Sequence, residues 1–311
     1  EIDEGLVGSE MCIRDRIELS RRGYVVGLID PYAQGLSSSS RSRIAATTQG
    51  YGMFALIEHV NESSDFNFIN KELLGSTGHS MGGNAAIRGA NYFGKKADEQ
   101  NKKSLLHSVY VSGYVLTLRD DVLKDVRSNV GVSYALYDEG SFRNELKNWD
   151  AANMKIAPES LRTVNSGLKK EEHISEVELG KYYGDLGSNT LRVIFNEELL
   201  HPFQPYNAEA TANQLAYFET VFGAPIKLDT YDQTWQWKEF FTLLNMIISF
   251  WLLIPLTRTL LKINFFKTLV KPIPEALPVQ NGVGKTIFWS VFFISAGIAC
   301  VTFIPLVEVA K

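Results

Sequence analysis

Apolar and polar residues alternate in blocks along the first two thirds of the chain. Short apolar runs typical of buried strands lie at 24–30, 71–80, 105–115, 129–139 and 190–201. The segments between these runs carry the wider apolar spacing of helices. Because strands that alternate with helices require right-handed crossovers, the pattern predicts an α/β fold with a doubly wound, mostly parallel sheet.

The segments between the apolar runs differ in how clearly they predict helices. The residues between 140 and 189 form a polar, charge-mixed stretch with weak periodicity. Two interpretations stay open for it, because so long a loop is unusual without a role: a lid inserted over a pocket, or a solvated surface excursion. Helices are predicted at 17–22, 47–60, 81–94, 119–126 and 207–225.

The pattern changes after residue 228, where two long runs contain no charged residue. These runs, 240–257 and 286–307, would be about 27 and 33 Å long as helices. A bilayer's hydrocarbon core is about 30 Å thick. The sequence therefore predicts a membrane region at 229–311 with two transmembrane helices. A pair of buried core helices is the alternative.

The loop between the two apolar runs indicates an orientation. It carries five basic residues against the single acidic Glu275: Arg258, Lys262, Lys267, Lys271 and Lys285. Since basic loops stay on the cytoplasmic side, we expect the globular part to lie outside the cytoplasm. Two cysteines in 311 residues fit a bacterial protein that does not depend on disulfides. We therefore expect an integral protein of a bacterial cell membrane.

The first residues of the chain do not fit the pattern. Residues 1–16 have no clear periodicity and do not begin with Met. They resemble translated adapter sequence at the ends of environmental gene fragments, so we expect them to be non-native. On this interpretation the chain is an internal fragment of a longer protein, and the globular domain spans 17–228.

Composition excludes several classes of function. The hydrophobic content of 45% excludes a disordered chain. A net charge of −4, with no basic face apart from the loop after residue 257, predicts no nucleic-acid partner. No cluster of His, Asp or Cys has the spacing of metal ligands, so neither a metal nor a cofactor is predicted. Nothing in the sequence indicates the oligomeric state.

One motif indicates a candidate catalytic residue. Gly78-His79-Ser80-Met81-Gly82 is a G-x-S-x-G between a predicted strand and a predicted helix, which is the setting of a nucleophile elbow. Such a turn needs small neighbours two residues before and after the serine, a need that Gly78 and Gly82 meet. The helix N-terminus would direct its main-chain N–H groups at an oxyanion beside Ser80. A purely structural turn is the alternative.

A serine nucleophile needs a base, and His201 is the best candidate among five histidines. It follows the last predicted strand, and α/β active sites form at the carboxyl ends of strands. The other histidines are expected to have other roles. His79 should pack with its side chain turned away from the nucleophile, and His59 should lie on a helix surface. His107 opens a strand, and His173 lies in a solvated charged segment.

The base in turn needs a carboxylate to orient it. Asp138 and Glu139 end the predicted strand 129–139, one strand before His201. Asp138 is the first choice, because "ALYD" places it at the carboxyl end of the strand, and Glu139 is the alternative. Ordinary loop caps are the structural interpretation of both.

These residues carry a resemblance to a known family. Over residues 17–225 the chain resembles the α/β-hydrolase superfamily, whose nucleophile–acid–base order matches Ser80, Asp138 and His201. The stretch 23–37 is similar to a strand and loop of that family, with Ala33 in place of its first glycine. The G-H-S-M-G-G form is similar to esterases, lipases and dienelactone-hydrolase-like proteins.

The resemblance implies acyl transfer by a Ser-His-Asp mechanism, with the Met81 N–H as one oxyanion donor. In the family the second donor comes from a loop before the first helix, which we expect to be missing here. The implied function is a membrane-anchored serine hydrolase that cleaves an ester of a small-molecule or lipid acyl substrate. A thioesterase, amidase or peptidase on the same residues is one alternative. A non-catalytic binding or sensing domain of a multi-span membrane protein is another.

Overall fold

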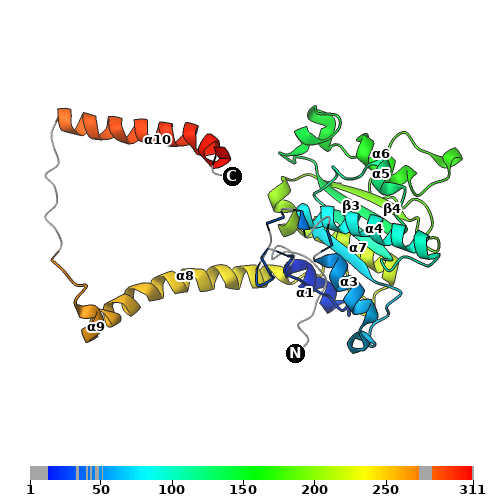
Figure 1. Cartoon of the computed structure of the whole chain (residues 1–311), viewed down its shortest axis with the longest axis horizontal. Helices are drawn as coiled ribbons and strands as arrows, with labels where there is room; N and C mark the ends of the chain where they lie inside the picture. Colours follow the sequence, from blue (N-terminus) through cyan, green and yellow to red (C-terminus); the bar gives the residue numbers. More distant parts are fainter. Residues whose placement is uncertain are drawn as a thin grey trace. The chain divides into compact units, whose positions relative to one another are not determined.

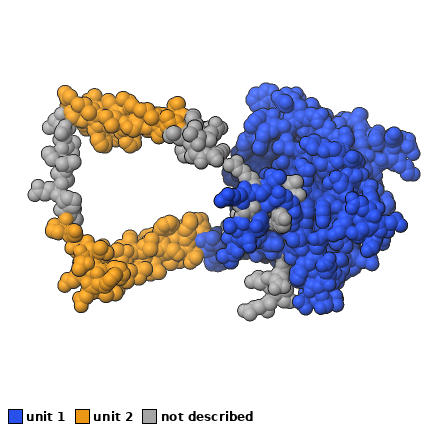
Figure 2. Space-filling model, viewed as in Figure 1, with its two compact units in different colours: residues 1–242 blue, residues 243–311 orange. Residues whose placement is uncertain are grey.

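The computed structural model describes residues 13–32, 35–39, 41–42, 44–45, 49–50, 52–272 and 282–309. Residues 1–12, most of the segment expected to be non-native, lie outside the described residues, and so does Ala33 of the expected family loop. Residues 13–16 belong to helix α1 (Ile13–Arg21). The chain forms two compact units, Glu1–Thr242 and Leu243–Lys311 (Figure 2).

Four parallel strands form the sheet of the first unit (Figure 1). They are β1 (Gly75–His79), β2 (Ser108–Ser112), β3 (Asn129–Ala135) and β4 (Arg192–Glu197), in the order β1-β2-β3-β4. Each lies inside one of the predicted apolar runs, so the α/β class and these four strands are confirmed. Among the described residues the order runs in one direction, so a doubly wound arrangement stays a prediction.

The prediction of a strand at 24–30 is wrong. This segment is described but belongs to no strand, and only Gly27 within it is buried. Tyr24 instead packs near the end of α7 (Ala208–Phe222), where its hydroxyl donates to the Gly223 carbonyl at 2.8 Å. An apolar run of this length suits a buried strand, but a strand also requires a paired neighbour, and this run has none among the described residues.

The helices predicted at 47–60, 81–94 and 119–126 are found as α3, α4 and α5, whereas α6 lies in the stretch 140–189, where no helix was predicted. The α-helices are α3 (Met53–Glu62), α4 (Met81–Gln100), α5 (Asp120–Leu123) and α6 (Pro158–Asn165). The 3₁₀ turns are η2 (Ser64–Phe66), η3 (Ser141–Arg143), η4 (Trp149–Ala152), η5 (Lys170–Glu172) and η6 (His201–Tyr206). The short helix predicted at 17–22 is the later part of α1.

The core has two clusters on opposite faces of the sheet. Val109 and Val111 of β2 pack with α3, α4 and α5, whereas Tyr110 between them packs with α1 and α7. Successive side chains of a strand point to opposite faces, so the two clusters lie on different sides of the sheet. Helices therefore flank the sheet on both faces.

The stretch 140–189 is not simply a solvated excursion. Met154, Ala157 and Val164 in its middle are fully buried in the same cluster as Val109. The Arg162 side chain also donates to the Leu118 carbonyl at 3.2 Å. The middle of this stretch thus completes the core next to β4. The weak periodicity of its sequence did not predict this burial.

The second unit contains the long apolar helices. Helix α8 (Trp235–Leu260) begins within the first unit, and α9 (Asn264–Lys267) and α10 (Val283–Val309) follow it. The apolar segments of α8 and α10 have mean hydropathy values of 1.9 and 1.6, and none of either segment is buried. Both helices are long and apolar enough to span a membrane. The alternative of buried core helices does not fit their exposed side chains.

The first turn of α8 is fixed to α1 inside the first unit. The buried Glu18 carboxylate accepts from the N–H groups of Thr234 and Trp235 at 2.7 and 3.0 Å. Arg22, also buried, lies 3.3 Å from the same carboxylate. A carboxylate at a helix N-terminus satisfies N–H groups that lack partners within the helix. This contact holds Thr234 and Trp235 against α1.

Candidate functional site

Ser80 lies at the junction of β1 and α4, in a strained conformation. Its φ of 57° and ψ of −116° are rare for a residue with a Cβ. Two hydrogen bonds hold the turn: Ser80 N–H donates to the Ser112 carbonyl at 2.8 Å, and Asn84 N–H donates to the Ser80 carbonyl at 3.1 Å. Strain held at one serine between a strand and a helix is the geometry of a nucleophile elbow.

The glycines around Ser80 differ in whether their surroundings leave room for a Cβ atom. A Cβ on Gly78 would lie 2.4–2.7 Å from main-chain atoms of Gly82, and one on Gly83 would lie 2.9 Å from the Ser112 carbonyl oxygen. A Cβ on Gly82 would meet nothing within 4 Å. Gly82 therefore does not have to be a glycine for steric reasons, contrary to the prediction. Gly78 and Gly83 do, because α4 approaches β1 closely at these positions.

Asp138 and His201 come together across the carboxyl ends of β3 and β4. Asp138 follows the end of β3 by three residues, and His201 begins η6, four residues after β4. Their Oδ2 and Nδ1 atoms lie 2.9 Å apart. Glu139 is exposed, so Asp138 is the carboxylate that contacts His201.

The surroundings of Asp138 keep it ionised. Burial raises the pKa of Asp138, but hydrogen bonds from His201 and from the Gly140 N–H outweigh burial and leave it below its ordinary value. The Gly140 N–H donates to Oδ1 at 2.6 Å. An ionised carboxylate is an acceptor only, so His201 donates its Nδ1–H and leaves Nε2 as the acceptor nitrogen.

His79 connects this pair to the Ser80 turn. The rings of His79 and His201 lie 4.5 Å apart between centroids, inclined by 39°. The Nδ1 of His79 is 3.1 Å from the Ser112 Oγ. Gly113 has a φ of +63°, and a Cβ there would lie 2.5 Å from the His79 ring. The sequence predicted that His79 packs with its side chain turned away from Ser80, in a structural or supporting role. The structure adds that it packs directly on His201.

The other histidines have separate environments. The His59 ring on α3 packs against Phe66, with centroids 5.8 Å apart. His107 precedes β2 and packs on Phe222, and burial lowers its pKa. His173 is exposed after η5. None of these contacts brings a further imidazole to Asp138 among the described residues.

A buried polar cluster supports the turn that carries His201. The carboxylate of Glu197, 2% exposed, accepts from Ser133 Oγ at 2.9 and 3.0 Å and from Gln204 Nε2 at 3.0 Å. Asn213 Nδ2 donates to it at 2.9 Å. Burial raises the pKa of Glu197 even though these hydrogen bonds lower it. Because Gln204 and His201 share η6, the cluster fixes this turn on β3 and β4. Sequence reasoning missed the cluster, since no motif marks it.

Comparisons with known proteins assign no family to the chain. No family model matches the chain, and no curated protein is similar to it at a significant level. Among the described residues no group of three or more His, Cys, Asp or Glu side chains could hold a metal ion. The site is therefore described by its residues alone: a strained serine and a carboxylate–imidazole pair.

Proposed function

We propose that this chain is a membrane-anchored serine hydrolase of the α/β-hydrolase type, with the doubly wound sheet of that family. It cleaves an ester by a Ser-His-Asp acyl-enzyme mechanism. The single observation that carries the proposal is the 2.9 Å hydrogen bond between Asp138 and His201. The His201 ring also packs, at a tilt, on the ring of His79, the residue directly before Ser80. A nucleophile, a base and an orienting acid are the three parts that acyl transfer needs.

In this mechanism Ser80 Oγ attacks the carbonyl carbon of the ester, and His201 Nε2 takes the hydroxyl proton. Asp138 holds the imidazole in the tautomer with hydrogen on Nδ1 and stabilises the imidazolium. When the tetrahedral intermediate collapses, His201 returns the proton to the leaving alcohol. Water, deprotonated by the same nitrogen, then attacks the acyl-Ser80 ester and releases the carboxylic acid.

The negative oxygen of the tetrahedral intermediate needs donors. Met81 is the first residue of α4, a helix of 20 residues, so its N–H has no acceptor within the helix. That N–H and the positive end of the helix dipole stabilise the oxyanion.

Two features favour an acyl substrate met at a membrane. Helices α8 and α10 are long and apolar enough to span a bilayer. The basic loop between them would stay in the cytoplasm, which leaves the α/β unit outside the cytoplasm of a bacterial cell. The substrate is a lipid or another small acyl compound at the cell surface, and nothing in the mechanism requires a metal or cofactor.

Ester turnover tests the proposal. The full chain in lipid nanodiscs should hydrolyse p-nitrophenyl esters, and Ser80→Ala should lower kcat by about 10⁴ or more. Ser38→Ala, at an exposed loop serine, is the matched control and should leave kcat unchanged. Equal turnover by wild type and Ser80→Ala would refute the proposal. A folded wild type without turnover on any ester of the series would favour a binding or sensing domain.

A further inference from the structure

The two ends of helix α8 differ in their charged residues. Near its start, Lys238 and Glu239 form an ion pair, with Nζ and Oε1 3.0 Å apart. We name residues 258–272, which contain the last turn of α8 and all of α9 (Figure 1), the basic segment. It carries no acidic residue and four basic ones: Arg258, Lys262, Lys267 and Lys271. Charge is therefore balanced at one end of the helix and strongly positive at the other.

The four cations of the basic segment have no counter-charge in the described part of the chain. All four side chains are exposed, and none forms an ion pair with a described carboxylate. Exposed arginines of the first unit do pair, as Arg127 does with Asp98 at 2.7 Å. Four unpaired charges of one sign in a short segment favour a negatively charged partner.

Apolar side chains lie between these cations, and the rest of the chain does not cover them. Ile263, Phe265, Leu269 and Val270 are between 49% and 79% exposed. Phe265 contacts Phe266, with ring centroids 4.9 Å apart, but neither hydrophobic core cluster includes a residue of the basic segment. Apolar side chains interleaved with cations are typical of segments that lie in the interface of a membrane.

The main chain of the basic segment satisfies many of its own polar groups. Turns continue from the end of α8 through α9, in which N–H groups donate to carbonyls three or four residues earlier at 2.9–3.1 Å. The donors are Leu261, Lys262, Ile263, Phe266, Lys267, Leu269 and Val270. A main chain with internal partners enters the boundary between head groups and acyl chains at a lower cost than an unpaired one.

The basic segment follows the apolar run 240–257 without a linker. At the helical rise, Lys262 would lie about 8 Å beyond the end of that run. The head groups on each side of a bilayer occupy about 5 to 8 Å. If α8 spans the membrane as proposed above, Arg258 and Lys262 lie at the depth of the lipid phosphates.

We propose that the basic segment lies on the membrane surface and binds anionic phospholipids. The phosphate groups pair with its four cations, and the side chains of Phe265 and Leu269 enter the boundary of the acyl chains. Basic segments next to a membrane span gain stability from anionic lipids and little from zwitterionic ones. A soluble polyanion would leave the apolar side chains in water. The proposal rests on the membrane anchoring proposed above and is independent of the chemistry at Ser80.

Lipid selectivity of the full chain provides the direct test. The chain is reconstituted in phosphatidylcholine vesicles, and electron paramagnetic resonance measures how much of a spin-labelled lipid the protein immobilises. Labelled phosphatidylglycerol should associate at least about threefold more strongly than labelled phosphatidylcholine. Salt at about 1 M, which shortens the screening length to about 3 Å, should remove most of this preference.

The controls for this test separate two failures. An inserted chain without lipid preference would overturn the present proposal and leave the anchoring intact. A chain that an alkaline carbonate wash removes from the vesicles would refute the anchoring, and the lipid site with it. Ester turnover, which depends on Ser80, decides neither result.

Two triple variants locate the bound lipid. One removes three cations from the basic segment, and the other removes three equally exposed cations from the first unit. They are Lys262→Gln/Lys267→Gln/Lys271→Gln and Lys102→Gln/Lys103→Gln/Lys124→Gln. The first should bring the association of the two lipids to within about 1.5-fold of each other, whereas the second should keep the wild-type preference. A wild-type preference in the first variant would overturn the proposal.

A depth measurement separates a lipid surface from a soluble polyanion. Phe265→Cys carries a spin label in a chain with Cys12→Ser and Cys300→Ser, and the exposed Lys102→Cys is the matched control. In vesicles with phosphatidylglycerol, the label at 265 should meet oxygen more readily than a water-soluble nickel complex. The label at 102 should show the reverse. Should the label at 265 match the control, the segment extends into water, where a soluble polyanion would be the partner, and the proposal fails.

Discussion

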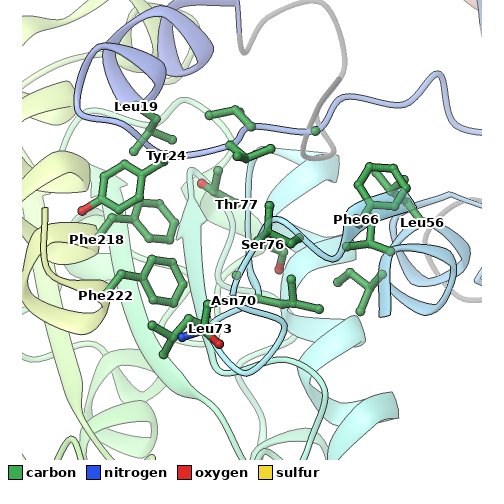
Figure 3. Close-up of a pocket in the computed structure, with 18 of the residues that line it drawn as sticks. Leu19, Tyr24, Leu56, Phe66, Asn70, Leu73, Ser76, Thr77, Phe218 and Phe222 are labelled. Atoms are coloured by element: carbon green, nitrogen blue, oxygen red, sulfur yellow. The ribbon is translucent and has the colours of Figure 1, made fainter. Parts of the chain in front are cut away.

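The carboxyl end of β1 and its outer edge differ in how completely their polar groups are satisfied. At the carboxyl end, Ser80 is held by a bond to Ser112, and Asp138 accepts from both His201 and Gly140. At the outer edge, Gly75 and Thr77 line a cavity of about 670 Å³ (Figure 3). The two regions are only a few residues apart on one strand.

This difference separates a supported site from an unsupported edge. A preorganised set of reacting groups lowers a barrier only when the surrounding structure holds it in place. The groups that we propose to react, at the carboxyl end, have that support. At the outer edge no described residue pairs with the peptide groups of Gly75 and Thr77, so that edge lacks the support that the carboxyl end has.

The largest expected effect is at Asp138. Asp138→Asn keeps the size of the side chain but removes the charge that holds the tautomer of His201, so kcat should fall by about 10⁴. Steady-state turnover of a p-nitrophenyl ester by the wild type and by Asp138→Asn measures the effect. Wild-type turnover in the variant would contradict the role proposed for Asp138.

The next effect separates the two glycines of the motif. Gly78→Ala places a Cβ within 2.4–2.7 Å of the Gly82 main chain, which should cost about 3 kcal/mol or more, as overpacking against backbone does. Gly82→Ala meets open space and should change stability by less than about 1 kcal/mol. Thermal unfolding of the two variants measures the difference. Equal destabilisation would contradict the described approach of α4 to β1.

The pH dependence of stability should report the Asp138–His201 pair. Because the pKa of Asp138 is lowered in the folded chain, its stabilisation is present above the ordinary carboxyl pKa of about 4 and is lost as pH falls through the lowered value. The free energy of unfolding of wild type should exceed that of Asp138→Asn at pH 7, and the gap should narrow below about pH 4. Chemical denaturation of both proteins across this pH range measures the gap. A gap that widens in acid would contradict the assignment.

The smallest expected effect concerns strain at Ser80. Ser80→Gly removes the Cβ from a residue at φ 57°, so the variant should be inactive yet more stable by about 1 kcal/mol. Ser80→Ala, which keeps the Cβ, is the control and should show no such gain. Chemical denaturation of the two variants gives the comparison. A less stable Ser80→Gly would mean that the conformation is not strained.

Much of this architecture is readable from the sequence because local rules govern it. The motif at 78–82 predicts a strand–turn–helix, and β1, Ser80 and α4 have that order. Asp138 ends one predicted strand and His201 comes at the end of the next, and the carboxyl ends of parallel strands meet at one edge. The exposed apolar helices α8 and α10 follow from runs without charge.

The features that sequence reasoning missed depend on partners distant in the chain. The run 24–30 has a strand's composition but no paired neighbour among the described residues, so no strand forms. Glu197 has the local sequence of an ordinary surface acid, and only the fold surrounds it with Ser133, Gln204 and Asn213. His79 contacts His201 only because the end of β1 and the start of η6 converge in the fold. Each of these depends on tertiary packing, which local pattern does not encode.

Covalent labelling of Ser80 tests the central claim most directly. The full chain in nanodiscs is treated with a fluorophosphonate, and the adduct is located by mass spectrometry of its peptides. We predict one adduct, on Ser80, which is absent in Ser80→Ala and strongly slowed in Asp138→Asn. A folded wild type that carries no adduct, or an adduct that persists in Ser80→Ala, would contradict the account.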